Sequence, residues 1–226
     1  MKITKISQQV KRKDRYSVYV DEKYSFSLSD YQLVSAGLRI GKEYTQAELT
    51  ELINNSEFGK AYERALNYVM IRPRSIREIR DYLTRTFLYP KPKMYVNKAG
   101  ERIVKKKEVD KSTVLYMIER VLERLEQKGY SDDQKFAEAW VRSRQLTKKS
   151  SKRKLQQELQ VKGVNSEIIT AVLTDDSIDE TENLKKMIEK KQKQARYQDT
   201  TKLTQYLLRQ GFTYSDIKTA LDTTTD

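Results

Sequence analysis

The first part of the chain alternates apolar and polar residues in the manner of β-strands. Two runs of apolar residues lie two positions apart on either side of Asp21-Glu22-Lys23: Tyr16, Val18 and Val20, then Tyr24, Phe26 and Leu28. A period of two is typical of half-buried strands. Residues 1–28 therefore predict a β-hairpin.

The spacing becomes helical from Ser29 onward. Ser29-x-x-Gln32 and Thr45-x-x-Glu48 both match the capping box, in which two side chains satisfy amides at the start of a helix. Apolar residues at helical spacing follow the second box: Leu49, Leu52 and Ile53. We expect two short helices after the hairpin.

From about Gly59 to the end, helical patterns repeat. A shift of 48 positions superposes seven residues of one segment on the next: Leu155, Leu159, Gly163, Val164, Ile169, Val172 and Leu173 on Leu203, Leu207, Gly211, Phe212, Ile217, Ala220 and Leu221. A looser copy lies upstream, and its matching residues are Ile79, Leu83, Ile118, Val121 and Leu122. An insertion of about 25 residues separates Leu83 from Ile118 in this copy. Gly163 and Gly211 stand where a helix would end in a left-handed residue.

These patterns predict a mainly α protein of tandem three-helix repeats that form an elongated curved rod. Small repeats bury little surface alone and gain stability by stacking on their neighbours. An N-terminal β-hairpin and a short inserted β-hairpin complete the expected fold. The boundaries that we predict are 1–58 for the hairpin and its short helices, 59–130 for the first repeat, 131–175 for the second and 176–226 for the third.

The insertion in the first repeat, at about 89–112, predicts a basic arm. Pro90-Lys91-Pro92 ends a helix, and Met94-Tyr95-Val96 and Glu101-Arg102-Ile103-Val104 are typical of two strands around a turn at 97–100. Residues 91–107 contain seven basic residues and one acidic residue, and the basic residues include Lys105, Lys106 and Lys107. We expect the arm to be positively charged.

The charge balance favours an anionic partner. Lys and Arg number 45 against 32 Asp and Glu, which gives a net charge of +13. Nucleic acid is the commonest soluble partner of such a chain, although net charge also serves solubility. Trp140 could stack on a base, but it shares an apolar stripe with Phe136, Ala137 and Val141, so we assign it to the core.

The chain contains neither Cys nor His. This excludes disulfides, thiolate nucleophiles, Ser-His-Asp triads, zinc proteases and nearly all transition-metal sites. Carboxylate-plus-magnesium chemistry and a Lys or Tyr base remain. The start of the chain has no apolar signal core, and no run reaches the ~18 apolar residues of a membrane span. We therefore expect a soluble cytoplasmic protein.

Two motifs gather basic residues at predicted helix starts. Ser75-x-x-Glu78 forms a capping box within a cluster of arginines, Arg72, Arg74, Arg77 and Arg80. A turn at 148–154, with Ser150 or Ser151 as the cap, carries five cations: Lys148, Lys149, Lys152, Arg153 and Lys154. The arginines suit an external anion or acidic surface, and the turn suits a phosphate that also uses the helix-start amides. Ordinary solvated charge is the alternative for both.

The adjacent carboxylates of Asp132 and Asp133 are the one feature of the sequence that could form a metal-dependent catalytic site. A helix start explains them better, because Ser131 or Asp132 has the position of an N-cap and Asp133 complements the helix dipole. The sequence therefore favours no catalytic residue, no metal and no cofactor.

Three ordered runs resemble the RecX family of RecA regulators. They are Arg72-Pro73-Arg74-Ser75-x-x-Glu78 followed by Leu83, then Gly129-Tyr130-x-Asp132-Asp133-x-x-Phe136-Ala137-x-x-Trp140-Val141-x-x-Arg144, then Leu155-x-x-x-Leu159-x-x-Lys162-Gly163-Val164. Leu33-Val34-x-x-Gly37-Leu38-x-x-Gly41 is similar to the N-terminal extension of RecX proteins from Gram-positive bacteria, and the third repeat is similar to their C-terminal repeat. The resemblance covers nearly the whole chain.

The resemblance implies a monomeric regulator of DNA repair, homologous recombination and the SOS response. Such a protein is not an enzyme; it binds RecA filaments on single-stranded DNA, with double-stranded DNA as a further candidate partner, and mostly inhibits RecA. The candidate contacts to RecA or DNA are basic: Arg72, Arg74, Arg77, Lys105, Lys106, Lys107, Arg144, Lys148, Lys149, Lys152, Arg153 and Lys154. The insertion departs from the family pattern. A helical-repeat protein that binds nucleic acid without RecA is the alternative, and a magnesium nuclease using Asp132 and Asp133 is a more distant one.

Overall fold

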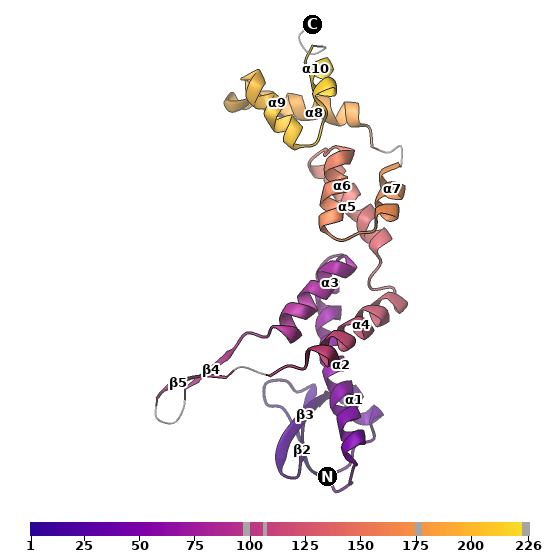
Figure 1. Ribbon diagram of the computed structural model, residues 1–226, viewed down its shortest axis with the longest axis vertical. Helices are drawn as coiled ribbons and strands as arrows, with labels where there is room; N and C mark the ends of the chain where they lie inside the picture. Colours follow the sequence, from indigo (N-terminus) through magenta and orange to yellow (C-terminus); the bar gives the residue numbers. More distant parts are fainter. Residues whose placement is uncertain (97–99, 106–107, 175–177, 223–226) are drawn as a thin grey trace. The chain divides into compact units, whose positions relative to one another are not determined.

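The computed structural model describes residues 1–96, 100–105, 108–174 and 178–222 (Figure 1). The chain forms two compact units. One unit comprises Met1–Arg72 and Ile79–Tyr130, and the other comprises Pro73–Glu78 and Ser131–Asp226. The predicted fold class is confirmed, because the chain is mainly helical with a small antiparallel sheet at its N-terminus. The rod shape stays a prediction.

The N-terminal sheet has three antiparallel strands in the order β1-β2-β3: Ile3–Gln8, Arg15–Val20 and Lys23–Ser29. The predicted hairpin is the β2-β3 pair, which turns through Asp21 and Glu22 at φ of 46° and 68°. Positive φ at both central residues gives a turn whose twist matches that of the strands. Strand β1 was not predicted, because Ile3 and Ile6 alone carry its apolar pattern.

Both capping boxes that follow the sheet are present. Ser29 caps α1 (Asp30–Ser35) and Thr45 caps α2 (Gln46–Ile71). The prediction of two short helices is wrong for the second, because α2 has 26 residues and passes without a break through residue 58. Gly59, at the predicted start of the first repeat, lies inside the helix, where a Cβ would overlap the Gln32 amide. Its role is close packing against α1.

The first repeat contains the inserted hairpin. Its elements after α2 are α3 (Ile76–Leu83), a π-helical turn η1 (Thr84–Leu88), β4 (Lys93–Val96), β5 (Arg102–Lys105) and α4 (Lys111–Gln127). Strands β4 and β5 pair in antiparallel register, as predicted. Residues 97–99 of the predicted turn lie outside the described residues. Helix α2 packs along α4 within this unit (Figure 1).

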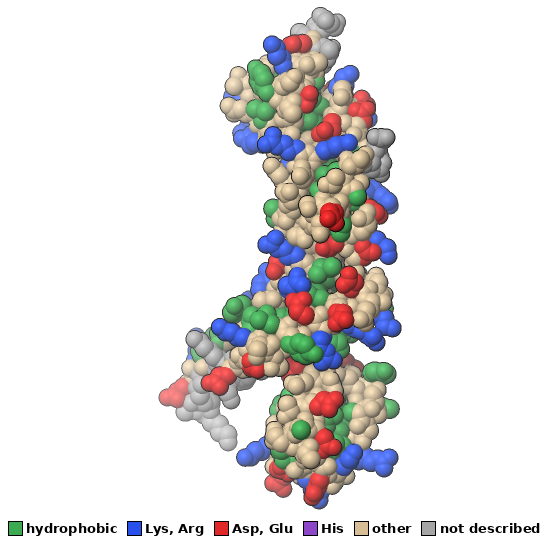
Figure 2. Space-filling view, turned by 45° about the vertical axis from the view of Figure 1, so that its right-hand side comes forward, with side chains coloured by type: hydrophobic (Ala, Val, Ile, Leu, Met, Phe, Trp, Pro, Cys, Tyr) green, Lys and Arg blue, Asp and Glu red, His purple; other side chains and the backbone are tan. Residues whose placement is uncertain are grey.

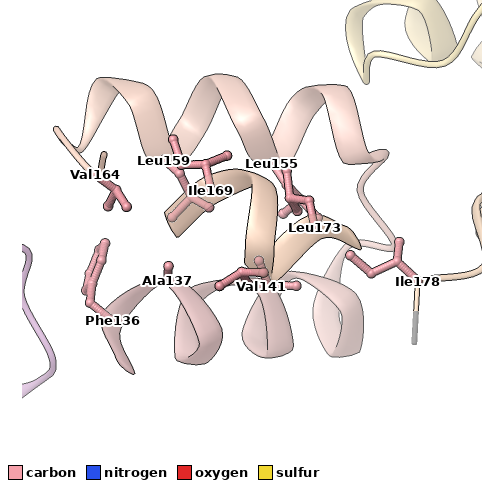
Figure 3. Close-up of a cluster of buried hydrophobic side chains, with 10 residues drawn as sticks. Phe136, Ala137, Val141, Leu155, Leu159, Val164, Ile169, Leu173 and Ile178 are labelled. Carbon is pink, nitrogen blue, oxygen red and sulfur yellow. The ribbon is translucent and has the colours of Figure 1, made fainter. Parts of the chain in front are cut away.

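The second and third repeats each contain three helices around their own core. They are α5 (Asp133–Thr147), α6 (Lys152–Val161) and α7 (Ser166–Thr174), then α8 (Glu180–Gln192), α9 (Thr200–Arg209) and α10 (Tyr214–Asp222), with a short turn η2 (Ala195–Tyr197) before α9. The predicted stripes converge in the core of the second repeat (Figure 3): Phe136, Ala137 and Val141, Leu155 and Leu159, and Ile169, Val172 and Leu173. Gly163 and Gly211 have φ of 77° and 90°, which confirms the left-handed helix ends.

Candidate nucleic-acid interface

Residues 73–78 meet the second repeat at a joint built on the predicted capping box. The Ser75 hydroxyl accepts from the Glu78 amide at 3.1 Å and donates to the Lys162 carbonyl at 2.7 Å. The Glu78 carboxylate accepts from the Ser75 amide at 3.4 Å and also pairs with the Lys162 ammonium at 2.6 Å. Asp133 adds a further contact, because its Oδ1 accepts from the Ile76 amide at 2.9 Å. The amide end of one helix thus meets the carbonyl end of another, an alignment favoured by their dipoles.

The same joint recurs between the second and third repeats. The Ser151 hydroxyl accepts from the Lys154 amide at 3.1 Å and donates to the Gln210 carbonyl at 2.7 Å. The carboxylate of Glu180 accepts from the Lys152 amide at 2.8 Å. Ser151 thus corresponds to Ser75 and Glu180 corresponds to Asp133. Each following repeat supplies both a carbonyl and a carboxylate to the helix start of the repeat before it.

The joints give Asp132 and Asp133 structural partners. Asp132 is the N-cap of α5, as predicted, and the hydrogen bond from the Lys135 amide lowers the pKa of the Asp132 carboxyl below its usual range. Asp133 does more than complement its own helix, because it caps Ile76. In the part of the chain that the structure describes, no three acidic side chains gather as a metal site would require.

The joint also changes the predicted phosphate site at 148–154. Ser151 is the cap, and two amides at the start of α6 are occupied: Lys152 donates to Glu180 and Lys154 donates to Ser151. The prediction that these backbone amides would hold a phosphate is therefore wrong for both. An anion bound here must depend on the side chains.

The structure brings part of this turn together with lysines of the third repeat. Lys148 and Lys149 line a groove of about 270 Å³ together with three lysines of α8, Lys186, Lys190 and Lys191. The other lining residues are Thr147 of α5, Met187 of α8, Tyr206 of α9 and Gln210 at the end of α9. We call these residues the lysine groove. Figure 2 shows Lys and Arg side chains gathered on the third repeat beside the second.

Few carboxylates neutralise the lysine groove. Lys186 pairs with Glu182 at 2.9 Å. Within the described ranges, Lys148, Lys149 and Lys190 form no ion pair. Glu182 and Glu189 lie on the same helix as three of the lysines, but neither carboxylate lines the groove. Its ammonium groups repel one another, so a polyanion would find a favourable potential.

Two tyrosines border the groove beside Lys191. The Lys191 ammonium lies 4.6 Å from the ring centroid of Tyr206 and 5.1 Å from that of Tyr197. The two ring centroids are 5.2 Å apart. Tyrosine is neutral at pH 7 by its ordinary pKa of about 10, and burial raises the pKa of the Tyr206 hydroxyl above that value. The groove therefore combines cations with a neutral aromatic surface.

The other predicted contact residues lie in different settings. On α6, Arg153 is exposed and its neighbours Lys152 and Lys154 are half-buried. After α2, Arg72 is exposed and Arg74 is half-buried. The side chain of Lys105, at the end of β5, is not described, and Lys106 and Lys107 lie outside the described residues. Arg77 is exposed, yet its aliphatic carbons lie close against Gly163.

Arg144 and Trp140 form a cluster that the sequence did not predict. The Arg144 Nε donates to Glu158 Oε2 at 2.7 Å, and its guanidinium lies 4.3 Å from the centroid of the Trp140 ring. The Trp140 indole packs at the edge of the core, and its N–H donates to the same oxygen at 2.9 Å. Glu158 thus holds both side chains, which gives Arg144 a structural role.

The fold defines a class of protein: a small N-terminal sheet followed by three-helix repeats, with a basic groove between the second and the third. Three family models match the chain, the RecX N-terminal domain at residues 1–45, the RecX second three-helix domain at 132–173 and the RecX third three-helix domain at 178–221. The chain belongs to the RecX family of regulatory proteins.

Relatives extend over almost all of the chain. Regulatory protein RecX of Listeria monocytogenes is 32% identical over 98% of this chain and 96% of that protein. Regulatory protein RecX of Bacillus subtilis is 32% identical over 97% of this chain and 76% of that protein. The fold is similar to a crystal structure of regulatory protein RecX, with a TM-score of 0.64 at 24% identity over 98% of both chains. RecX from Lactobacillus salivarius gives a TM-score of 0.51 at 21% identity, over 73% of this chain and 94% of that one. Among the described residues, no helix is both long and apolar enough to cross a bilayer.

Proposed function

We propose that this protein binds RecA filaments on single-stranded DNA and inhibits the recombinase, ATPase and co-protease activities of RecA. Membership of the RecX family, with matches to the N-terminal domain and two repeats, is the observation that carries this proposal. It acts in the cytoplasm as a monomer, in DNA repair and the SOS response. Its action is that of a bound regulator and not of an enzyme.

The repeated joints support this function. Hydrogen bonds from Ser75 and Ser151 join residues 73–78 to the second repeat and the second repeat to the third. Neighbour-to-neighbour contacts of this kind present several surfaces along one polypeptide. One molecule can then contact more than one subunit of a polymer, and its net charge of +13 speeds its approach to an anionic filament.

A titration of RecA strand exchange tests the proposal. We expect strand exchange, and ATP hydrolysis on single-stranded DNA, to fall when this protein is present well below one molecule per RecA subunit. The reason is that each bound molecule disturbs several subunits. If both activities stayed constant up to equimolar protein while naked DNA bound tightly, the RecA proposal would fail. The alternative, nucleic-acid binding without RecA, would then take its place.

The magnesium nuclease makes a separate prediction. Asp132 and Asp133 each accept a backbone amide, so we expect no sustained cleavage of DNA by the purified protein in magnesium buffer. Asp133→Asn is the suitable variant because the amide oxygen can still accept from Ile76. Cleavage that Asp133→Asn abolishes without loss of fold would contradict the regulator proposal.

A further inference from the structure

Several helices of this protein end in a left-handed residue, which is glycine in all of them but one. Helices α4, α6 and α9 are each followed by a glycine in the left-handed conformation, with φ of 72° at Gly129, 77° at Gly163 and 90° at Gly211. Helix α5 ends in the same way, with φ of 53°, but the residue there is Lys149. Its amide donates to the Arg144 carbonyl at 3.0 Å, which closes the helix end.

A lysine at this position carries backbone strain that a glycine would avoid. In the left-handed conformation the Cβ of an L-residue crowds the following carbonyl oxygen, and only glycine escapes the penalty. Strain of this kind is informative because it is often retained at functional sites. The question is what the Lys149 side chain supplies in return.

The side chain of Lys149 lines the lysine groove. Here it joins Lys148 from the same turn and Lys190 from α8, and none of these three has a carboxylate partner in the described part of the chain. Internal stability therefore gains no ion pair from Lys149, and the added repulsion lowers it. The arrangement suits an external ligand that carries several negative charges.

The chemistry of the groove suits a chain of phosphates. All five of its cations are lysines, which bind phosphate as point charges without a fixed bidentate geometry. Tyr206 forms part of the wall, and Tyr197 lies next to it. An aromatic surface beside a row of cations is the arrangement by which proteins bind single-stranded nucleic acid, because bases stack while lysines contact the backbone.

We infer that the lysine groove binds the phosphodiester backbone of single-stranded nucleic acid, and that Lys149 is a binding residue kept at the expense of stability. This inference deepens the proposed function, on which it rests for the relevance of single-stranded DNA. The groove is the point at which the protein contacts the strand itself.

Lys149→Gly tests the inference through two readouts of opposite sign. The glycine removes both the charge and the strain, so we expect weaker binding together with a melting temperature about 2–4 °C higher, the shift that a small gain in stability gives in a chain of this size. Affinity is measured by fluorescence anisotropy with labelled oligo-dT on the full chain without RecA. We expect a several-fold loss, and a slope of log K against log salt that is shallower by roughly 0.7, the contribution of one phosphate contact.

Three further variants separate charge from strain. Lys149→Gln removes the charge but keeps the strain, and we expect the binding loss with no gain in melting temperature. Lys190→Gln removes a groove charge from a helix and should also weaken binding. Lys185→Gln is the matched control, because Lys185 is exposed on the same helix and does not line the groove. It should leave affinity within twofold of the wild type.

Equal affinities for Lys149→Gly, Lys190→Gln and Lys185→Gln would overturn the inference. Competition with polyglutamate gives a second test. If polyglutamate displaced oligo-dT equally well from the wild type and from Lys190→Gln, the inference would also be overturned, since the groove would then play no part in the binding of oligo-dT. Because the assay contains no RecA, its failure leaves the RecA proposal standing. Equally, a RecA titration without effect leaves the groove result intact.

Discussion

At the scale of single residues, the same backbone conformation meets different surroundings. Gly129 and Gly163 have nearly equal φ, 72° and 77°. A Cβ at Gly129 would have no heavy atom within 4 Å, whereas a Cβ at Gly163 would overlap Arg77 Cδ and lie 2.7 Å from Arg77 Cβ. Gly129 is therefore required by its conformation alone, and Gly163 by its conformation and by the packing of the joint.

Alanine at these two positions should separate the two requirements. We expect Gly129→Ala to lower the free energy of unfolding by about 1 kcal/mol, the lower end of the left-handed penalty. Gly163→Ala should lower it by about 2–4 kcal/mol, because overpacking against Arg77 adds to the same penalty. Urea denaturation of the full-length variants measures both. Equal losses would mean that Arg77 moves aside without cost.

The residue scale also shows what a local pattern can and cannot predict. The sequence predicted the Ser75-Glu78 box and the left-handed glycines, because both depend on residues within one helical turn. It could not predict that Ser75 donates to Lys162, which is 87 residues away. The sequence alone did not single out Lys149, because its significance depends on the left-handed backbone angle that only the structure shows.

At the scale of elements, the chain uses one joint twice. Ser75 with Asp133 and Ser151 with Glu180 perform the same two tasks at the two joints. The predicted helices are present because their apolar spacing is local. The groove was not predicted, since it needs α5 and α8 to meet and no periodicity reports such a meeting.

Ser75→Ala measures the strength of a joint. The hydroxyl is fully buried and makes both a cap and a hydrogen bond to Lys162. Loss of the cap costs about 1 kcal/mol and loss of the second bond about 1 kcal/mol more, so we expect the free energy of unfolding to fall by about 2 kcal/mol. Ser29→Ala is the matched control, because the hydrogen bonds that the structure gives for the Ser29 hydroxyl all go to Gln32, within its own turn. Thermal and urea unfolding should show about half the loss for Ser29→Ala, and identical losses would indicate that the Lys162 bond adds nothing.

At the scale of the whole molecule, charge opposes stability. The net charge is +13 at pH 7 and climbs toward +45 as the 32 carboxylates are protonated. Three of these carboxylates are helix N-caps whose pKa values are lowered in the folded protein. Hydrogen bonds donated to each carboxylate lower these pKa values. The donors are the Thr113 and Ser112 hydroxyls at Asp110, the Lys135 amide at Asp132 and the Lys202 amide at Asp199.

The sign of the pH dependence follows from these caps. A carboxyl group whose pKa is lower in the folded than in the unfolded chain stabilises the fold above the unfolded value of about 4. That stability is lost as the pH falls through the folded pKa. Self-repulsion among the lysines and arginines grows over the same range. We therefore expect the free energy of unfolding to fall steadily from about pH 5 to pH 3.

Asp110→Asn, Asp132→Asn and Asp199→Asn combined in one protein should isolate the caps from the repulsion. Asparagine caps a helix about as well as aspartate but binds no proton in this range, so the triple variant should lose stability less steeply on acidification. Added salt at about 1 M screens the repulsion in both proteins and should raise both curves at pH 3 while leaving the difference between their slopes. Urea denaturation at pH 3, 4, 5 and 7, at low and high salt, gives the four curves. Parallel curves for wild type and variant at both salts would assign acid sensitivity to the net charge alone, because the caps would then bind protons equally in the folded and unfolded chains.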